Sequence, residues 1–150
     1  MRRMKQMWLS LALLSFLPLA AATATTKVDK SSAHTTDWAP VMEAIIQVES
    51  HGDAAAKSGN SVGAMQITPI LVKECNLILQ QRGEKRRYTL DDRLSVQKSK
   101  EMFLLIQSHR NPTGCIETAI RAWNGGPRFS RKATERYYRK VMRALEKQKG

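Results

Sequence analysis

Glu49 is the residue whose surroundings point most directly to chemistry. Met42, Ile46 and Glu49 recur at helical spacing, and Gly52 suits the end of that helix. The carboxyl is therefore expected at the edge of an apolar helix face. Burial among apolar groups disfavours the ionised form and raises a carboxyl pKa, so such a group can still protonate the leaving oxygen of a glycosidic bond near neutral pH. The alternative is a glutamate at a helix end that points into solvent.

A turn rich in sugar-binding groups follows Glu49. Its sequence is Gly-Ala-Met-Gln-Ile-Thr-Pro, at positions 63–69. Gly63 permits a tight turn or a close approach to a ligand. Gln66 offers both a donor and an acceptor to sugar hydroxyl or N-acetyl groups, or it begins a helix in solvent. Met65 can pack on a sugar face or in the core.

A second turn, Ala-Trp-Asn-Gly-Gly at positions 122–126, lies much further along the chain. Trp123 is either a platform on which a sugar stacks or a core residue at helical spacing. Asn124 can cap the turn, adopt a left-handed conformation or bind sugar.

A second catalytic carboxylate is hard to place. Glycosidases usually place two carboxyl groups about 5 to 9.5 Å apart. Between positions 50 and 73 the only acid is Asp53, which is best interpreted as a turn residue. Asp91 and Asp92 precede a helical pattern and are interpreted as caps. With one carboxylate there is no obvious base to activate water.

The Glu-Ser helix end, the Gly-x-Met-Gln turn and the aromatic-Asn-x-Gly turn resemble, in this order, those of the soluble lytic transglycosylase family. That family shares the goose-type lysozyme-like fold, and the resemblance covers roughly residues 37–138. It implies that Glu49 protonates the glycosidic oxygen between N-acetylmuramic acid and N-acetylglucosamine. Glu49 would then take the proton from the muramoyl 6-hydroxyl, so that a 1,6-anhydro ring closes.

The resemblance also implies roles for other residues and shows two departures. Ser50 completes the Glu-Ser pair, and its hydroxyl could bind the carboxylate, the substrate or a backbone carbonyl. Ala64 stands where the family usually has Leu. Trp123 replaces a Tyr whose hydroxyl lies near the catalytic Glu in the family. Of Tyr137 and Tyr138, one is expected to face the site and the other the core. The predicted substrate-binding residues are Ser50, Met65, Gln66, Trp123, Asn124 and Tyr137.

Helical periodicity dominates the elements that must position these groups. Apolar residues recur at helical spacing in five stretches, and no convincing period-two alternation appears. The fold class is therefore predicted as all-α or α-dominated, a small lysozyme-like helical domain. The stretches run from a cap at Asp37 to Gly52, from Pro69 to about Leu79 with Ile70, Leu77 and Ile78 apolar, from a cap at Asp92 through Leu94 to Ile106, from Ile116 to Trp123, and from Thr134 to Lys147.

The N-terminal part is predicted to lie outside this domain. A basic start, an apolar run of about a dozen residues and an Ala-rich segment indicate a secretory signal peptide at 1–24, cleaved at Ala22 or Ala24. The apolar run is shorter than the roughly 20 residues of a membrane span, which is the alternative. Residues 25–36 form a polar linker. Residues 37–150 form the lytic transglycosylase-like domain.

Cysteine and charge give two further expectations. Cys75 and Cys115 either form a disulfide or are two buried small residues, and no metal or cofactor is implied. The net charge is +12, and residues 128–150 carry nine Lys or Arg against two Glu, which gives +7. Such a segment attracts polyanions of the cell envelope or is a solvated helix face, and no nucleic acid partner is expected for an exported protein.

The sequence thus favours an exported lytic transglycosylase of the periplasm or cell envelope that acts on peptidoglycan glycan strands. It would keep no stable membrane anchor after signal cleavage. One alternative is a muramidase that hydrolyses the same bond with water. Another is a non-catalytic wall-binding or assembly subunit. Small domains of this family often serve envelope-spanning secretion, conjugation or phage machines, so such a machine is a further implied partner.

Overall fold

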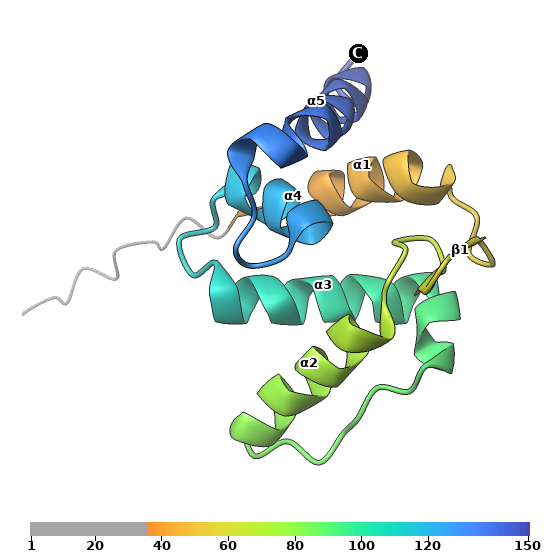
Figure 1. Ribbon diagram of the computed structural model, residues 1–150, viewed down its shortest axis with the longest axis vertical. Helices are drawn as coiled ribbons and strands as arrows, with labels where there is room; N and C mark the ends of the chain where they lie inside the picture. Colours follow the sequence, from red (N-terminus) through yellow and green to blue (C-terminus); the bar gives the residue numbers. More distant parts are fainter. Residues whose placement is uncertain (1–35) are drawn as a thin grey trace, which may run out of the picture. The chain divides into compact units, whose positions relative to one another are not determined.

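The computed structural model describes residues 36–150, which include five α-helices, one 3-10 helix and one small sheet (Figure 1). The predicted helix-dominated fold is confirmed. The predicted signal peptide lies outside the described residues, as does nearly all of the predicted linker. Within the described part, no helix is both long and apolar enough to cross a membrane. The elements are α1 (Ala39–Ser50), β1 (Lys57–Ser58), β2 (Ser61–Val62), α2 (Pro69–Gln81), η1 (Asp91–Leu94), α3 (Val96–Arg110), α4 (Ile116–Gly125) and α5 (Arg131–Lys147).

The core lies between α3 and the helices on either side of it. Helix α2 packs on α3, while α1, α4 and α5 pack on one another (Figure 1). Phe103 of α3 is fully buried at the centre. The ring centroid of Phe103 lies 5.7 Å from that of Trp38 and 5.2 Å from that of Trp123. These aromatic contacts join the start of α1, the middle of α3 and the end of α4 into one apolar cluster.

Polar side chains set the helix starts. The carboxylate of Asp37 accepts the Ala39 N–H at 3.0 Å, but the N-cap of α1 is Trp38, one residue after the predicted cap. The hydroxyls of Thr68, Ser95 and Ser130 cap α2, α3 and α5. The predicted cap of the third helix at Asp92 is wrong. Asp92 lies inside η1 and accepts the Thr89 N–H instead, because the chain makes a separate 3-10 turn before α3.

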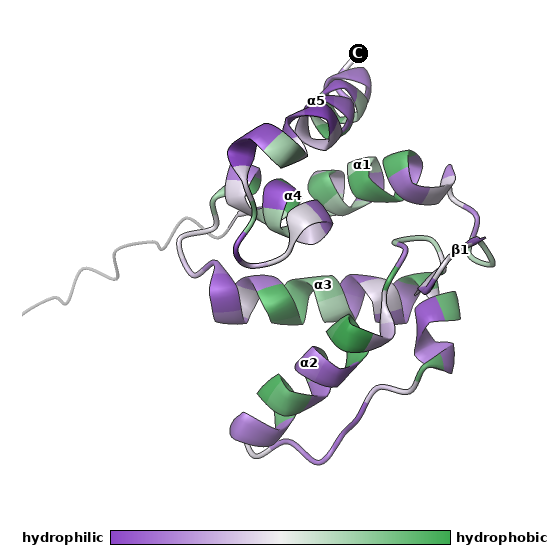
Figure 2. Ribbon diagram, viewed as in Figure 1, coloured by the Kyte–Doolittle hydropathy of each residue, from purple (hydrophilic) through white to green (hydrophobic). Residues whose placement is uncertain are grey.

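The apolar face predicted for α2 is also wrong in part. Ile78 is buried with Val72, Cys75 and Leu79, but Ile70 is 79% exposed and Leu77 is 52% exposed. Helix α2 turns the other apolar residues toward α3, so Ile70 and Leu77 remain on the outer side. Figure 2 shows that apolar and polar residues alternate along α2, whereas α5 is hydrophilic over most of its length.

The two cysteines form no disulfide in the structure. Cys75 is buried on α2, and Cys115 is exposed just before α4. The prediction that both are small buried residues therefore holds only for Cys75.

A buried arginine links α5 to α4. The sequence analysis missed this residue. The Arg121 side chain is 5% exposed and pairs with Glu117 and Glu135, each at 2.8 Å. Its guanidinium carbon lies 4.2 Å from the centre of the Tyr138 ring. These contacts fix the rotation of α5 about its axis, and with it the direction in which Tyr137 points.

Candidate active site

Glu49 occupies the last turn of α1, where the chain leaves the helix. His51 has a φ of 54° and Gly52 a φ of 90°, so the backbone turns left-handed directly after the helix. The N–H of His51 still bonds the Gln47 carbonyl. This sharp exit places Glu49 half-buried, at the border between the apolar face of α1 and solvent.

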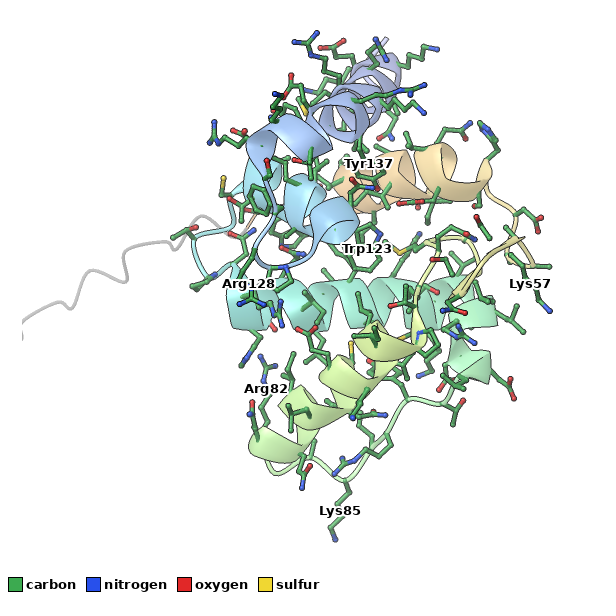
Figure 3. The ribbon with its side chains drawn as sticks, viewed as in Figure 1. Lys57, Arg82, Lys85, Trp123, Arg128 and Tyr137 are labelled. Atoms are coloured by element: carbon green, nitrogen blue, oxygen red, sulfur yellow. The ribbon has the colours of Figure 1, made fainter. Side chains whose placement is uncertain are left out.

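Tyr137 of α5 contacts Glu49 directly. Its hydroxyl donates a hydrogen bond of 2.7 Å to Oε1 of Glu49. In Figure 3 the Tyr137 side chain projects from α5 toward α1. Tyr138 instead stacks with Arg121. Tyr137 is thus the tyrosine that contacts Glu49, while Tyr138, expected in the core if Tyr137 faced the site, is only partly buried.

The environment of Glu49 favours its protonated form. Burial raises the pKa of this carboxyl above its ordinary value, while the Tyr137 hydrogen bond and the charge of Lys140 partly oppose that rise. Burial, and then the neighbouring Glu49 carboxylate, raises the pKa of Tyr137 as well. Tyr137 therefore stays neutral at physiological pH and remains a hydrogen-bond donor to Glu49.

The turn at residues 63–68 faces Glu49 and requires unusual backbone angles. Gly63 has a φ of 84°, and a Cβ at this position would overlap the carbonyl oxygen of Arg93. Gln66 also has a positive φ, of 52°. Its side-chain NH₂ donates to the carbonyls of Gly63 at 2.9 Å and Ala56 at 3.2 Å. Both amide hydrogens of Gln66 are thus used by main-chain carbonyls, which leaves its side-chain oxygen as an available acceptor.

Two side chains from other elements hold this turn in place. The Ser50 hydroxyl donates to the Ala64 carbonyl at 2.8 Å, with the Ile46 carbonyl 3.3 Å away as a second acceptor. The indole N–H of Trp123 donates to the Met65 carbonyl at 3.2 Å. Ser50 and Trp123 therefore position the turn through its main chain. The Met65 side chain itself is fully buried in the core.

A cavity of about 240 Å³ lies in front of Glu49. Glu49 is the only acid among its lining residues within the described chain. Asp53, the nearest acid in sequence, accepts the Ala55 N–H at 2.8 Å, as expected for a turn residue. The cavity is lined by Glu49, Ser58, Ser61, Gln66, Thr68, Leu71, Trp123 and Asn124.

A second cavity, of about 500 Å³, lies between α2, α3 and α4. The two share Thr68, Leu71, Trp123 and Asn124 in their walls. Figure 3 shows the Trp123 side chain between α4 and α3. The two cavities therefore adjoin at these residues and are together called the cleft; the second cavity also has an acid, Glu74, in its lining.

The structure brings most of the predicted site residues to this cleft. The cavity is lined by four of them: Glu49, Gln66, Trp123 and Asn124. Tyr137 does not line the cavity but donates a hydrogen bond to Glu49. Ser50 and Met65 lie next to the cavity and do not line it. The sequence analysis missed four lining residues: Ser58, Ser61, Thr68 and Leu71. The only signal for them was their closeness in sequence to the Gly-Ala-Met-Gln turn.

Comparison with family models gives one match, to the transglycosylase SLT domain, over residues 27–145. Comparison with curated proteins and with solved structures gave no significant match. The matched range contains Glu49, both turns and Tyr137, and it covers most of the chain. Domains of this family act on peptidoglycan in the cell envelope. This chain therefore belongs to the transglycosylase SLT domain family.

Proposed function

We propose that the protein is an exported lytic transglycosylase that cleaves the bond between N-acetylmuramic acid and N-acetylglucosamine and leaves a 1,6-anhydro end. The observation that carries this proposal is the state of Glu49. It is half-buried, its pKa is raised, a neutral tyrosine binds it, and it is the only acid lining its cavity within the described residues.

Glu49 acts first as the general acid. Tyr137 engages Oε1, so the other carboxyl oxygen is left to face the glycosidic oxygen in the cavity. Burial raises the pKa of Glu49 and so favours the protonated form that a general acid needs. Transfer of this proton to the leaving oxygen breaks the bond to the sugar C1.

Glu49 acts second as the general base. Its carboxylate takes the proton of the muramoyl 6-hydroxyl, and the hydroxyl oxygen attacks C1 to close the anhydro ring. This chemistry needs no second carboxylate, which agrees with the lining of the cavity. The Tyr137 hydroxyl stabilises the ionised form of Glu49 between the two steps. Tyr137 supplies a hydroxyl beside Glu49, which Trp123 lacks. The indole N–H of Trp123 cannot take its place, because it is already bonded to the Met65 carbonyl.

The other cleft residues bind and orient the strand. The free side-chain oxygen of Gln66 and the amide of Asn124 suit the hydroxyl and N-acetyl groups of the sugars. The exposed edge of Trp123 offers an apolar contact. Ser50 and Met65 act on the substrate through the turn that they hold. The signal peptide predicted at residues 1–24 would place the enzyme in the periplasm or cell envelope.

The test is Glu49→Gln, which keeps shape and removes the transferable proton. General acid and base catalysis contributes about 10²–10⁴ in rate, so release of soluble fragments from purified sacculi should fall at least a hundredfold. Glu84→Gln is the matched control. It makes the same substitution in the loop after α2, where Glu84 pairs with Arg86. A Glu49→Gln protein that digests sacculi within threefold of the parent would contradict the proposal.

A further inference from the structure

One face of α5 carries a row of basic side chains. The basic residues of this row, from Lys132 to Lys147, recur at intervals of one, three or four residues. This spacing places them within an arc of about 100° along about 22 Å of helix. All are exposed. Arg139 pairs with Glu135 at 2.7 Å, and within residues 36–150 the other members form no ion pair. This basic stripe consists of Lys132, Arg136, Arg139, Lys140, Arg143 and Lys147.

The stripe borders a groove between α1 and α5. Lys140, Arg143 and Lys147 form one wall of this groove, whose volume is about 810 Å³. Among residues 36–150, the only acid in its lining is Glu43, and that carboxylate is already paired with Lys100 of α3 at 2.5 Å. The groove thus combines three basic side chains with no free carboxylate, which is the electrostatic character of an anion-binding surface.

One residue of the groove lies near the candidate catalytic residue. Lys140 is in its wall, and the charge of Lys140 acts on the Glu49 carboxyl. On α5, Lys140 lies one helical turn after Tyr137, the residue that binds Glu49. A polymer chain held at Glu49 would therefore carry its substituents past this groove.

The apolar side of α5 is not available for a membrane. Val141 is fully buried and Leu145 nearly so, and both belong to the core. The helix therefore cannot insert an apolar face into lipid, as interfacial helices do. The outer face that carries the basic stripe offers positive charge to a partner. A repeated carboxylate on the substrate itself is the occupant that fits both the charge and the position.

We propose that the basic stripe of α5 and the adjoining groove bind the carboxylates of the peptide stems carried by the peptidoglycan strand that is cleaved at Glu49. This inference rests on the proposed function and adds a specificity to it: the enzyme prefers strands that still carry free stem carboxylates. The stripe docks the strand, and the cavity at Glu49 performs the chemistry.

The experiment measures binding in a Glu49→Gln background, so that turnover does not consume the ligand. The ligands are soluble peptidoglycan fragments with intact stems, the same fragments with stem carboxylates amidated, and fragments with stems removed. The test protein carries Lys140→Gln, Arg143→Gln and Lys147→Gln. The control carries Lys73→Gln, Lys85→Gln and Arg87→Gln, an equal charge loss on α2 and the loop after it. Figure 3 shows Lys85 at the far end of the domain from α5.

Exposed ion pairs each contribute severalfold at most, so the test protein should bind intact-stem fragments on the order of tenfold more weakly than its parent. The control protein should bind them within twofold of its parent. Amidated and stem-free fragments should bind parent and test proteins alike. The affinity of the parent for intact-stem fragments should fall more steeply with salt than that of the test protein.

Three outcomes would overturn the inference. The first is equal affinity of the parent for amidated and free-carboxylate fragments. The second is an equal loss in the control protein, which would show that only net charge matters. The third is stronger binding of the parent to anionic phospholipid vesicles than to intact-stem fragments, which would assign the surface to a membrane. A Glu49→Gln protein that still cleaves would contradict the proposed function instead, so the two failures are distinguishable.

Discussion

Removal of the Tyr137 hydroxyl tests whether its hydrogen bond to Glu49 stabilises the ionised carboxylate during turnover. Tyr137→Phe keeps the ring between α5 and α1 and deletes only the donor 2.7 Å from Oε1 of Glu49. A hydrogen bond to a charged group contributes about 1.5–3 kcal/mol. Every step in which Glu49 is ionised should therefore lose that stabilisation, and turnover on sacculi should fall on the order of 10- to 100-fold.

The pH dependence of the same variant has a defined sign. The Tyr137 hydrogen bond lowers the pKa of Glu49 and so opposes the rise caused by burial. Without that hydrogen bond, the pKa of Glu49 should rise further. The limb of the kcat/KM profile on which the general acid loses its proton should then move to higher pH.

Tyr138→Phe is the matched control for this experiment. It removes a hydroxyl from the next residue of α5, whose ring stacks under Arg121. The assay is the release of soluble muropeptides from sacculi across a series of pH values. If Tyr137→Phe retained turnover within threefold of the parent and an unmoved pH limb, Tyr137 would have no part in preparing Glu49.

Three further changes test the frame around the site. Gly63→Ala should destabilise the fold by at least about 1–3 kcal/mol in chemical denaturation, because its Cβ would overlap the facing backbone in addition to the cost of a positive φ. The control Gly83→Ala, at a φ of 71° with open space around it, should lose clearly less stability. Trp123→Phe should keep the aromatic packing but lose the hydrogen bond to the Met65 carbonyl, which lowers stability by about 1 kcal/mol and reduces turnover. Unchanged turnover would show that this hydrogen bond has no part in catalysis. Glu49→Gln should raise the melting temperature near pH 7, because burial penalises the ionised carboxylate of the parent. The gain should vanish below about pH 4, where Glu49 is protonated in both the folded and the unfolded parent. A gain in melting temperature that persists at low pH would show that improved packing causes it.

The sequence predicted the parts of the site that short motifs encode. The helical spacing around Glu49 and the left-handed exit near Gly52 are local properties, so they could be recognised from a few neighbouring residues. The same holds for the helices that begin near Asp37 and Pro69. The pairing of Tyr137 with Glu49 joins residues 88 positions apart. The sequence placed Tyr137 among the substrate-binding residues but did not predict its hydrogen bond to Glu49.

The remaining features depend on tertiary packing. The hairpin strands have two residues each, too short for any alternation to appear in the sequence, yet Ser58 and Ser61 line the cavity. A buried Arg121 contradicts the usual preference of arginine for the surface. Its tertiary partners explain it: two glutamates on α4 and α5, and the Tyr138 ring. The outward position of Ile70 follows from how α2 rests on α3, which no local pattern encodes.

The mass of the released ends tests the central claim most directly. Purified sacculi are digested to completion with the protein, and the muropeptides are measured by mass spectrometry without prior reduction. If Glu49 acts alone as acid and then as base, the new ends should be 1,6-anhydro-N-acetylmuramic acid, lighter than the hydrolysis product by one water. Products with mainly reducing ends would show that water is the nucleophile, and would contradict the account in favour of a muramidase.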